Sequence, residues 1–128
     1  MILGVGVDIV EVARIEAAME KYGQRFLRRV FTEREIEYCL GKGPAAGVYF
    51  AGKFAGKEAF VKAIGTGIAA GVRWRDVEIL NDPAGKPYFE ISGAAREKMG
   101  QLGARNAVVS ISHTKNYAVA VVIIESAE

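Results

Sequence analysis

Two aliphatic segments near the end of the chain constrain its fold most strongly. Residues 106–113, "NAVVSISH", and residues 117–124, "YAVAVVII", are rich in valine, isoleucine and alanine, and a short polar stretch separates them. Runs of this length and composition are typical of β-strands, and so short a connection joins antiparallel neighbours. The sequence therefore predicts a hairpin, with its turn at residues 113–116, within a largely antiparallel sheet.

Helix and strand patterns alternate along the rest of the chain without a Pro/Ser-rich linker. Thr32 stands three residues before Glu35, which is the spacing of a capping box at a helix start. Gly65 has the position of a left-handed helix cap, and Ser92 has that of an N-cap. We therefore predict a single α+β domain over residues 1–128, with helices packed on the sheet. The other expected strands are 2–10, 77–80 and 88–91, and the expected helices begin near residues 11, 32, 45 and 92.

The composition is that of a folded protein, with 51% hydrophobic residues, 25% charged residues and a formal net charge of +2. So small a net charge does not by itself indicate a nucleic-acid partner. Cys39 is the only cysteine, which excludes an intrachain disulfide and favours a small buried hydrophobe. No apolar run approaches the roughly 20 residues that span a bilayer, and the N-terminus lacks the pattern of a secretory signal. We expect a soluble cytoplasmic protein.

Asp8 lies near the end of the first expected strand, on a face with little side-chain bulk. Gly4 and Gly6 share this face, so a ligand or another backbone could approach the carboxylate closely. Asp8 could instead cap the helix that follows, because an aspartate near a helix N-terminus accepts backbone N–H bonds. The sequence leaves both interpretations open, a helix cap or a metal ligand.

Glu58 precedes Lys62 by four residues on the long expected helix, the orientation that favours a weak surface ion pair. Phe54 continues the same helical face, so Glu58 shares its direction with an aromatic ring and could be partly buried. A partly buried carboxylate needs a cation or hydrogen-bond donors. Together with Asp8 it would suit Mg²⁺, which prefers oxygen ligands, while Lys62 could contact a phosphate.

Several nearby features have plain structural explanations. The "GTG" of residues 65–67 matches neither common glycine-rich nucleotide motif and follows a helix, so Gly65 is explained more simply as its cap. His113, the only histidine, stands where a strand meets a turn; it is either structural or able to bind phosphate or move a proton. Lys53 and Lys57 lie on a neighbouring face of the long helix, and their roles stay open.

Basic residues recur at helical spacing in the first third of the chain. Arg14, Lys21, Arg25 and Arg28 form a basic stripe if the helix continues or resumes beyond Gly23. A solvated helix face explains such a stripe, but its charge would also steer an acidic partner. The chain shows no zinc-ligand spacing and no aromatic RNA-binding motif. Nucleic acid is therefore the weaker choice, and we expect no nucleic-acid partner.

Five segments, in their order and spacing, resemble a single family almost from end to end. Together they are similar to holo-(acyl-carrier-protein) synthase, the short bacterial type of 4′-phosphopantetheinyl transferase. Glycines at positions 52 and 56, where the family more often has alanine, remove no motif residue. The segments are "GVGVDIVEVARIE" (4–16), "FTEREIEY" (31–38), "FAGKEAFVKAIGTGI" (54–68), "NDPAGKPYFE" (81–90) and "VSISHTKNYAVAVV" (109–122).

This resemblance implies the 4′-phosphopantetheinyl transferase fold and transfer of the 4′-phosphopantetheine arm from coenzyme A to a serine of apo acyl carrier protein, releasing adenosine 3′,5′-bisphosphate. It also implies a role in fatty acid biosynthesis, Mg²⁺ as cofactor, and a homotrimer with active sites between neighbouring subunits. The missing nucleophile fits this chemistry, because the carrier protein brings the serine. The group that removes the serine proton stays open between Glu58 and a metal-bound water.

The resemblance also implies roles for individual residues. Asp8 and Glu58 match the family's metal-binding aspartate and glutamate, and Lys62 matches the lysine of the same helix, so we expect these three to be catalytic. Arg14 and the rest of the basic stripe match the surface that docks the carrier protein. The residues expected along the coenzyme A site are Lys62, Gly65, Gly85, Lys86, Pro87, Ser112 and His113.

A hypothesis from another class is a non-enzymatic basic module that binds an acidic protein or nucleic acid. It explains the basic stripe but gives no reason for a half-buried carboxylate near Asp8. The two hypotheses therefore differ at Glu58, whose loss would stop metal-dependent transfer but leave binding by the stripe intact.

Overall fold

The computed structural model describes residues 1–65 and 71–127. The expected helices and strands follow one another in the predicted α+β order, and further short helices cover residues 24–30, 43–45 and 74–76. The strands are β1 (Ile2–Glu11), β2 (Val77–Asn81), β3 (Pro87–Ile91), β4 (Ala104–His113) and β5 (Tyr117–Ser126). The α-helices are α1 (Val12–Tyr22), α2 (Gln24–Val30), α3 (Glu33–Leu40), α4 (Ala46–Ile64) and α5 (Gly93–Gln101), and the 3-10 helices are η1 (Gly43–Ala45) and η2 (Trp74–Asp76).

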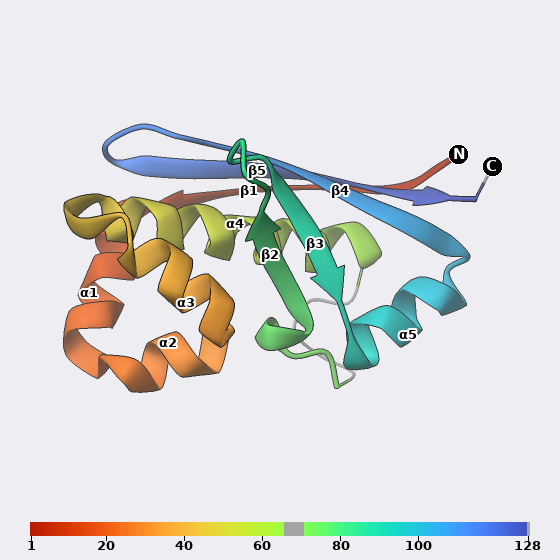
Figure 1. Cartoon of the computed structure of the whole chain (residues 1–128). Coiled ribbons are helices and arrows are strands. Elements are labelled where there is room, and N and C mark those ends of the chain that lie inside the picture. The colour runs from red at the N-terminus through yellow and green to blue at the C-terminus, as the bar shows by residue number, and fades with distance from the viewer. Residues whose placement is uncertain (66–70, 128) are drawn as a thin grey trace.

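An antiparallel sheet in the order β1-β5-β4 forms one layer, and the helices lie against one of its faces (Figure 1). β4 and β5 form the predicted hairpin, in which His113 is opposite Ala118. A second antiparallel ribbon, β2-β3, packs against α4 and β4. The predicted fold class, helices on a largely antiparallel sheet, is confirmed.

Helix α4 runs directly against β1, because two glycines leave room for its backbone. A Cβ atom at Gly6 would overlap the carbonyl oxygen of Ala59, and one at Gly4 would overlap that of Ala63. The bare face of the first strand is therefore filled by a helix backbone, which is one of the two occupants that the sequence allowed. The close approach also brings Asp8, which lies on the same face of β1, next to α4.

Replacing Gly6 by alanine is expected to lower the free energy of unfolding by at least about 1–3 kcal/mol, because β1 and α4 must separate to admit the methyl group. A Cβ atom at Gly100, in α5, meets no atom within 4 Å, so Gly100→Ala is the matched control. It should leave stability unchanged or raise it by up to about 1 kcal/mol. Urea unfolding of both variants measures the difference; equal stabilities would contradict the close packing.

The helix ends show which local patterns were reliable. The capping box is confirmed: Glu35 Oε1 accepts the N–H of Thr32 at 2.8 Å, and Thr32 Oγ1 accepts the N–H of Glu35 at 3.3 Å. Gly65 ends α4 with a φ of 82°, as predicted for a left-handed cap. Ser92 does precede α5, but its side chain makes no capping hydrogen bond. Gly93 has a φ of 56°, so the backbone turns between Ser92 and the regular helix.

Lys57, whose role the sequence left open, is a buried structural cation. Its Nζ lies 2.9 Å from Glu35 Oε1 and also donates to the carbonyl oxygens of Trp74 and Val77. The other carboxylate oxygen of Glu35 accepts the N–H of Ile79 at 2.8 Å. Both charged side chains are fully buried. The pair therefore ties α3, α4 and β2 together within the core.

Two expectations from composition can be compared with the fold. Cys39 is fully buried, as predicted, and burial raises the pKa of its thiol to about 12. Such a thiol is protonated and unreactive at neutral pH. Within residues 1–65 and 71–127, no helix has the length and apolar character needed to cross a membrane.

Candidate active site

Asp8 and Glu58 approach one another from two different elements, β1 and α4. Burial raises the pKa of Glu58, and the negative charge of Asp8 raises it further, whereas Lys62 and Arg14 lower it. Electrostatic effects of this kind act between charges that are close together. The structure therefore gathers the two predicted carboxylates, the predicted phosphate-binding lysine and one arginine of the basic stripe.

Lys62 is bound to Asp8 rather than to Glu58. Its Nζ donates to Asp8 Oδ1 at 2.9 Å and to the carbonyl oxygen of Val7 at 3.3 Å. The hydrogen bond to Asp8 raises the pKa of Lys62, which therefore stays protonated at neutral pH. The Lys62 side chain is 53% exposed and that of Asp8 is 14% exposed, so the ammonium group faces solvent over a mostly covered carboxylate.

Two structural interpretations that the sequence allowed are therefore wrong: Asp8 as a helix cap, and a surface ion pair between Glu58 and Lys62. Helix α1 begins after Glu11 without a side-chain cap, so Asp8 is not its capping residue. Among the described residues, the ion pair of Lys62 is the one with Asp8, not the surface pair with Glu58 that helical spacing allowed. The reason is the glycine-mediated approach of β1 to α4, which places Asp8 within reach of the lysine.

The two carboxylates are suited to a magnesium site in which the substrate supplies a further ligand. Mg²⁺ is usually held by one or two carboxylates together with waters and substrate phosphates. Burial is the largest cause of the raised pKa of Glu58, and the negative charge of Asp8 adds to it. A divalent cation would relieve this repulsion between the two carboxylates. The described part of the chain contains no cluster of three or more His, Cys, Asp or Glu side chains suited to a metal. The residues present therefore fit Mg²⁺, for which they would supply two ligands.

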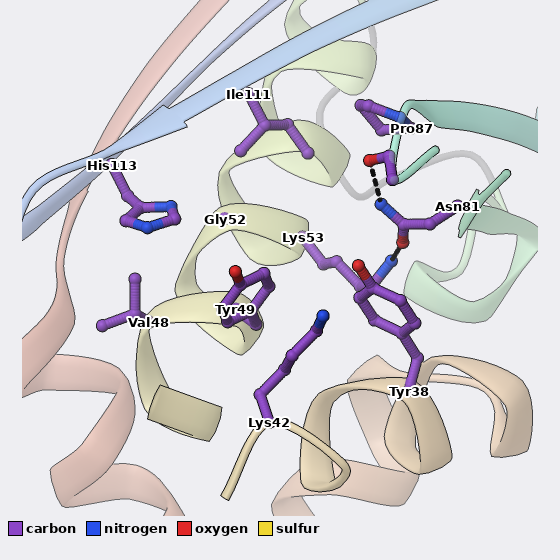
Figure 2. Close-up of a pocket in the computed structure, with 11 residues that line it drawn as sticks. Tyr38, Lys42, Val48, Tyr49, Gly52, Lys53, Asn81, Pro87, Ile111 and His113 are labelled. Carbon is purple, nitrogen blue, oxygen red and sulfur yellow. Dashed lines mark hydrogen bonds between the residues drawn. The ribbon is translucent and has the colours of Figure 1, made fainter. Parts of the chain in front are cut away.

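A cavity of about 300 Å³ opens between α3, α4, the β2-β3 turn and β4 (Figure 2). Three residues that the sequence placed along the coenzyme A site, Gly85, Pro87 and His113, line it. Lys86 and Ser112 are exposed neighbours of these residues and do not line the cavity. The complete lining is Tyr38, Lys42, Val48, Tyr49, Gly52, Lys53, Asn81, Gly85, Pro87, Ile111 and His113.

The cavity combines aromatic rings with two cations. Lys42 Nζ lies 4.8 Å from the ring centre of Tyr38 and 4.9 Å from that of Tyr49. The ring of Tyr49 in turn stands edge-on to His113, with 5.4 Å between the ring centres. Lys53 is almost fully buried and donates to Asn81 Oδ1 at 2.6 Å. Flat rings beside ammonium groups suit a ligand that carries both an aromatic base and phosphates.

The cavity and the carboxylate pair lie on opposite faces of α4. Glu58 is nine positions after Tyr49, and at about 100° per residue the two side chains therefore point to opposite sides of the helix. Neither Glu58, Lys62 nor Asp8 lines the cavity. The structure thus brings the predicted residues together as two groups on one chain, not as one site.

Eight of the eleven lining residues escaped prediction, and four of these supply the aromatic rings and ammonium groups: Tyr38, Lys42, Tyr49 and Lys53. Lys53 was noticed in the repeated "FAGK" segment, but its helical face could not be assigned to a cavity. Tyr38 and Lys42 are four residues apart, a spacing compatible with contact around a helix end, yet no sequence pattern links them to His113. These contacts depend on how α3, α4 and β4 pack.

The basic stripe is exposed but not continuous. Gly23, with φ of 56° and ψ of −131°, ends α1 and separates it from α2. Arg14 and Lys21 lie on α1, whereas Arg25 and Arg28 lie on α2, and all four are exposed. Arg28 also pairs with Glu33 at 3.1 Å. Gly65 is exposed at the end of α4, and residues 66 and 67 of "GTG" lie outside the described residues.

The 4′-phosphopantetheinyl transferase superfamily matches residues 4–122 of the sequence, which is nearly the whole chain. The chain belongs to this superfamily. Among curated relatives, the holo-[acyl-carrier-protein] synthase of Koribacter versatilis is 50% identical over 98% of this chain and 99% of its own length. That of Protochlamydia amoebophila is 51% identical over 94% of this chain and 95% of its own length.

Solved structures of the same family share the fold. The holo-[acyl-carrier-protein] synthase of Neisseria meningitidis has 36% identity and a TM-score of 0.88, with coverage of 98% of this chain and 100% of its own. The Helicobacter pylori enzyme, crystallised in complex with coenzyme A, has 35% identity and a TM-score of 0.83, with coverage of 94% and 99%. The transferase fold expected from the resemblance is therefore confirmed.

Proposed function

We propose that this chain transfers 4′-phosphopantetheine from coenzyme A to a serine of apo acyl carrier protein, in a reaction that needs Mg²⁺ and releases adenosine 3′,5′-bisphosphate. The observation that carries this proposal is the Asp8–Glu58 carboxylate pair with Lys62 bound beside it. The relatives named above act on acyl carrier protein, and one was crystallised with coenzyme A. Fatty acid biosynthesis is the process that such a carrier would serve.

Each group of the site has a distinct task in this proposal. Asp8 and Glu58 would hold Mg²⁺, which would supply positive charge to the pyrophosphate of coenzyme A. Lys62 adds a fixed positive charge at the same place, because its bond to Asp8 keeps it protonated and oriented. The cavity lined by Gly85, Pro87 and His113 takes the adenine and phosphate end of coenzyme A. Lys86, Ser112 and Gly65 stay proposed contacts that rest on the family resemblance.

The direct test of this reaction is release of adenosine 3′,5′-bisphosphate from coenzyme A, followed by chromatography. Release is expected only when the chain, apo carrier protein and Mg²⁺ are all present, because the carrier supplies the attacking hydroxyl. Release without carrier protein would indicate hydrolysis of coenzyme A instead of transfer. The lone buried Cys39 and this substrate together support a reducing, cytoplasmic location.

We also propose that three copies of the chain assemble, with each active site between neighbours. The outward face of the sheet is apolar and unusually exposed: Val5, Val7 and Ile9 of β1 are 52–65% exposed, and Val121 of β5 is 38% exposed. Such a continuous apolar face favours a protein partner. In this assembly a neighbour's cavity completes the carboxylate pair, because neither Asp8 nor Glu58 lines the cavity of its own chain.

Analytical ultracentrifugation should give the mass of three chains. Val7→Glu places a charge in the middle of the exposed apolar face and is expected to shift the protein toward monomers, with loss of transfer. Gln101→Glu adds the same charge at an exposed position on α5, away from the outward face of the sheet, and is the matched control. A monomer with full transfer activity would contradict both the trimer and the shared site.

The basic residues Arg14, Lys21, Arg25 and Arg28 are proposed to dock the carrier protein. Arg14 is near enough to Glu58 to lower its pKa, so a partner bound at Arg14 would have its serine beside the metal ligands. The break at Gly23 spreads the remaining three side chains over two short helices instead of one line. Exposed cations of this kind steer an acidic partner and orient it on approach.

A further inference from the structure

Four arginines surround an open depression of about 480 Å³ between α2 and η2. Arg28 and Arg29 come from α2, and Arg73 and Arg75 flank Trp74 in the segment around η2. The two segments are more than forty residues apart in the sequence, so the depression exists only in the folded chain. The remaining lining residues are Thr32 and Asp76.

The charges of this cluster are not balanced within the chain. Arg28 pairs with Glu33 at 3.1 Å, and Arg73 lies 3.9 Å from Asp76. Asp76 is buried and already accepts the N–H of Arg73 at 3.1 Å, so its charge is engaged in capping η2. In residues 1–65 and 71–127, the side chains of Arg29 and Arg75 form neither an ion pair nor a hydrogen bond. Excess positive charge therefore faces solvent at this depression.

The depression is continuous with the surface proposed to dock the carrier protein. Arg29 also lines a neighbouring groove that contains Tyr22, Arg25 and Phe26. Arg28 belongs both to the docking stripe and to the depression. A continuous series of cations thus leads from α1, across α2, to η2.

The η2 segment also borders the face of α4 that carries Glu58. Trp74 packs against Phe54, with 5.2 Å between ring centres and 35° between the ring planes. Phe54 is one helical turn before Glu58 and lies on the same face of α4. Arg14 lies near Glu58 on the α1 side. On the other side, Arg73 and Arg75 precede and follow Trp74, the residue that contacts Phe54. A partner that delivers a serine to Glu58 would have cations on two sides of its point of entry.

We propose that Arg29, Arg73 and Arg75, with Arg28, extend the docking surface and bind a second acidic segment of apo acyl carrier protein. This inference rests on the proposed transferase function. The open depression and the spread of the four cations over two elements fit a line of carboxylates on a protein surface better than one small anion. The carrier would then contact α1 and η2 at once, which fixes its orientation over the carboxylate pair.

The test compares Arg73→Glu/Arg75→Glu with the unaltered chain. The KM for a bacterial apo acyl carrier protein should rise about tenfold, with the KM for coenzyme A unchanged, because reversing exposed charges weakens encounter with an acidic partner. The rise should shrink in high salt, which screens exposed charges. Arg73→Gln/Arg75→Gln removes the positive charges without introducing repulsion from Asp76, and it should raise the KM for the carrier by about threefold. This neutral variant supplies the test if the charge-reversed variant unfolds.

Arg96→Glu/Arg105→Glu is the matched control, since both arginines are exposed and lie on α5 and β4. It changes the same total charge and should leave the KM for the carrier unaltered. Binding of fluorescently labelled apo carrier is measured alongside transfer, so that the two proposals fail separately. Carrier binding without transfer in the unaltered chain would refute the proposed function alone.

Three results would overturn the extended surface. One is carrier affinity unchanged by the Arg73 and Arg75 substitutions in both the charge-reversed and the neutral variants. Another is an equal loss of carrier affinity in the Arg96 and Arg105 control, which would indicate only a net-charge effect. The third is binding of a labelled RNA duplex more tightly than the carrier and lost in the same variant, which would assign the cluster to nucleic acid.

Discussion

Replacing Glu58 by glutamine is expected to lower kcat for phosphopantetheine transfer at least about hundredfold, since loss of a charged group at a phosphoryl-transfer centre costs two or more orders of magnitude. Glutamine has the same shape but removes the negative charge that the metal requires. Glu58 is only half-buried and makes no ion pair in the described chain, so the fold and carrier binding should persist. Steady-state kinetics with a Mg²⁺ titration, together with anisotropy of labelled carrier, measure the two effects separately.

The pH dependence offers an independent readout of the same carboxylate. Burial and Asp8 raise the pKa of Glu58, so protons compete with Mg²⁺ at a higher pH than they would at an isolated carboxylate. The apparent Mg²⁺ affinity should therefore fall as pH decreases through the pKa of Glu58, and this step should be absent from the glutamine variant. Glu97→Gln, at an exposed position on α5, should change neither property. Undiminished transfer by Glu58→Gln would rule out the proposed metal role.

Replacing Lys57 by methionine is expected to lower the free energy of unfolding by about 3–5 kcal/mol, the usual cost of leaving one partner of a buried ion pair uncompensated. Lys57 and Glu35 are both fully buried, and the ammonium group also satisfies two backbone carbonyls. Burial lowers the pKa of Lys57, while the carboxylate of Glu35 opposes this effect. A loss of this size is a large part of the 5–15 kcal/mol by which domains are usually stable.

The exposed pair between Arg28 and Glu33 provides the control. Its two side chains are 62% and 70% exposed, so Arg28→Met should change the free energy of unfolding by no more than about 1 kcal/mol. Chemical denaturation of both variants and of the unaltered chain gives the comparison. Because Lys57 immediately precedes Glu58, loss of the buried pair should also loosen the position of Glu58 and lower kcat in the folded fraction. Equal losses in the free energy of unfolding for Lys57→Met and Arg28→Met would show that the buried pair does not stabilise the core more than an exposed pair does.

Local sequence patterns predicted the elements well because their causes are local. The alternation of residues 2–10 depends on a two-residue period, and the capping box of Thr32 and Glu35 depends on a spacing of three. Gly65 ends α4 because a left-handed conformation suits glycine. Ser92 is the exception: it precedes α5 but makes no capping hydrogen bond, and Gly93 after it has a φ of 56°.

The site was only partly predictable, because its contacts join distant residues. Asp8 and Glu58 could be selected as carboxylates in unusual surroundings, but the bond between Asp8 and Lys62 depends on the approach of β1 to α4. The same spacing rules would have paired Lys62 with Glu58. The burial of Lys57 was equally hidden, since its partner Glu35 belongs to another helix and both were compatible with an exposed face.

The cavity shows a second limit of sequence patterns. Gly85, Pro87 and His113 were assigned to the coenzyme A site through the family resemblance, and they do line one cavity. The rings of Tyr38 and Tyr49 lie on either side of Lys42 in this cavity. In the sequence they stand in helical patterns that are equally typical of aromatic residues in a core, so nothing marked them as cavity residues. The exposed apolar face of β1 was likewise ambiguous, because alternation predicts two faces but does not reveal which one a partner covers.

The intact mass of the carrier protein tests the proposed function most directly. Purified chain, apo acyl carrier protein, coenzyme A and Mg²⁺ are mixed, and the carrier is expected to gain one phosphopantetheine group of about 340 Da through metal-dependent phosphoryl transfer. The gain should disappear when a chelator removes Mg²⁺ and when the acceptor serine of the carrier is replaced by alanine. With Glu58→Gln in place of the unaltered chain, the gain should be at least about hundredfold slower. A carrier whose mass stays unchanged with the unaltered chain, or increases equally with Glu58→Gln, would contradict the account.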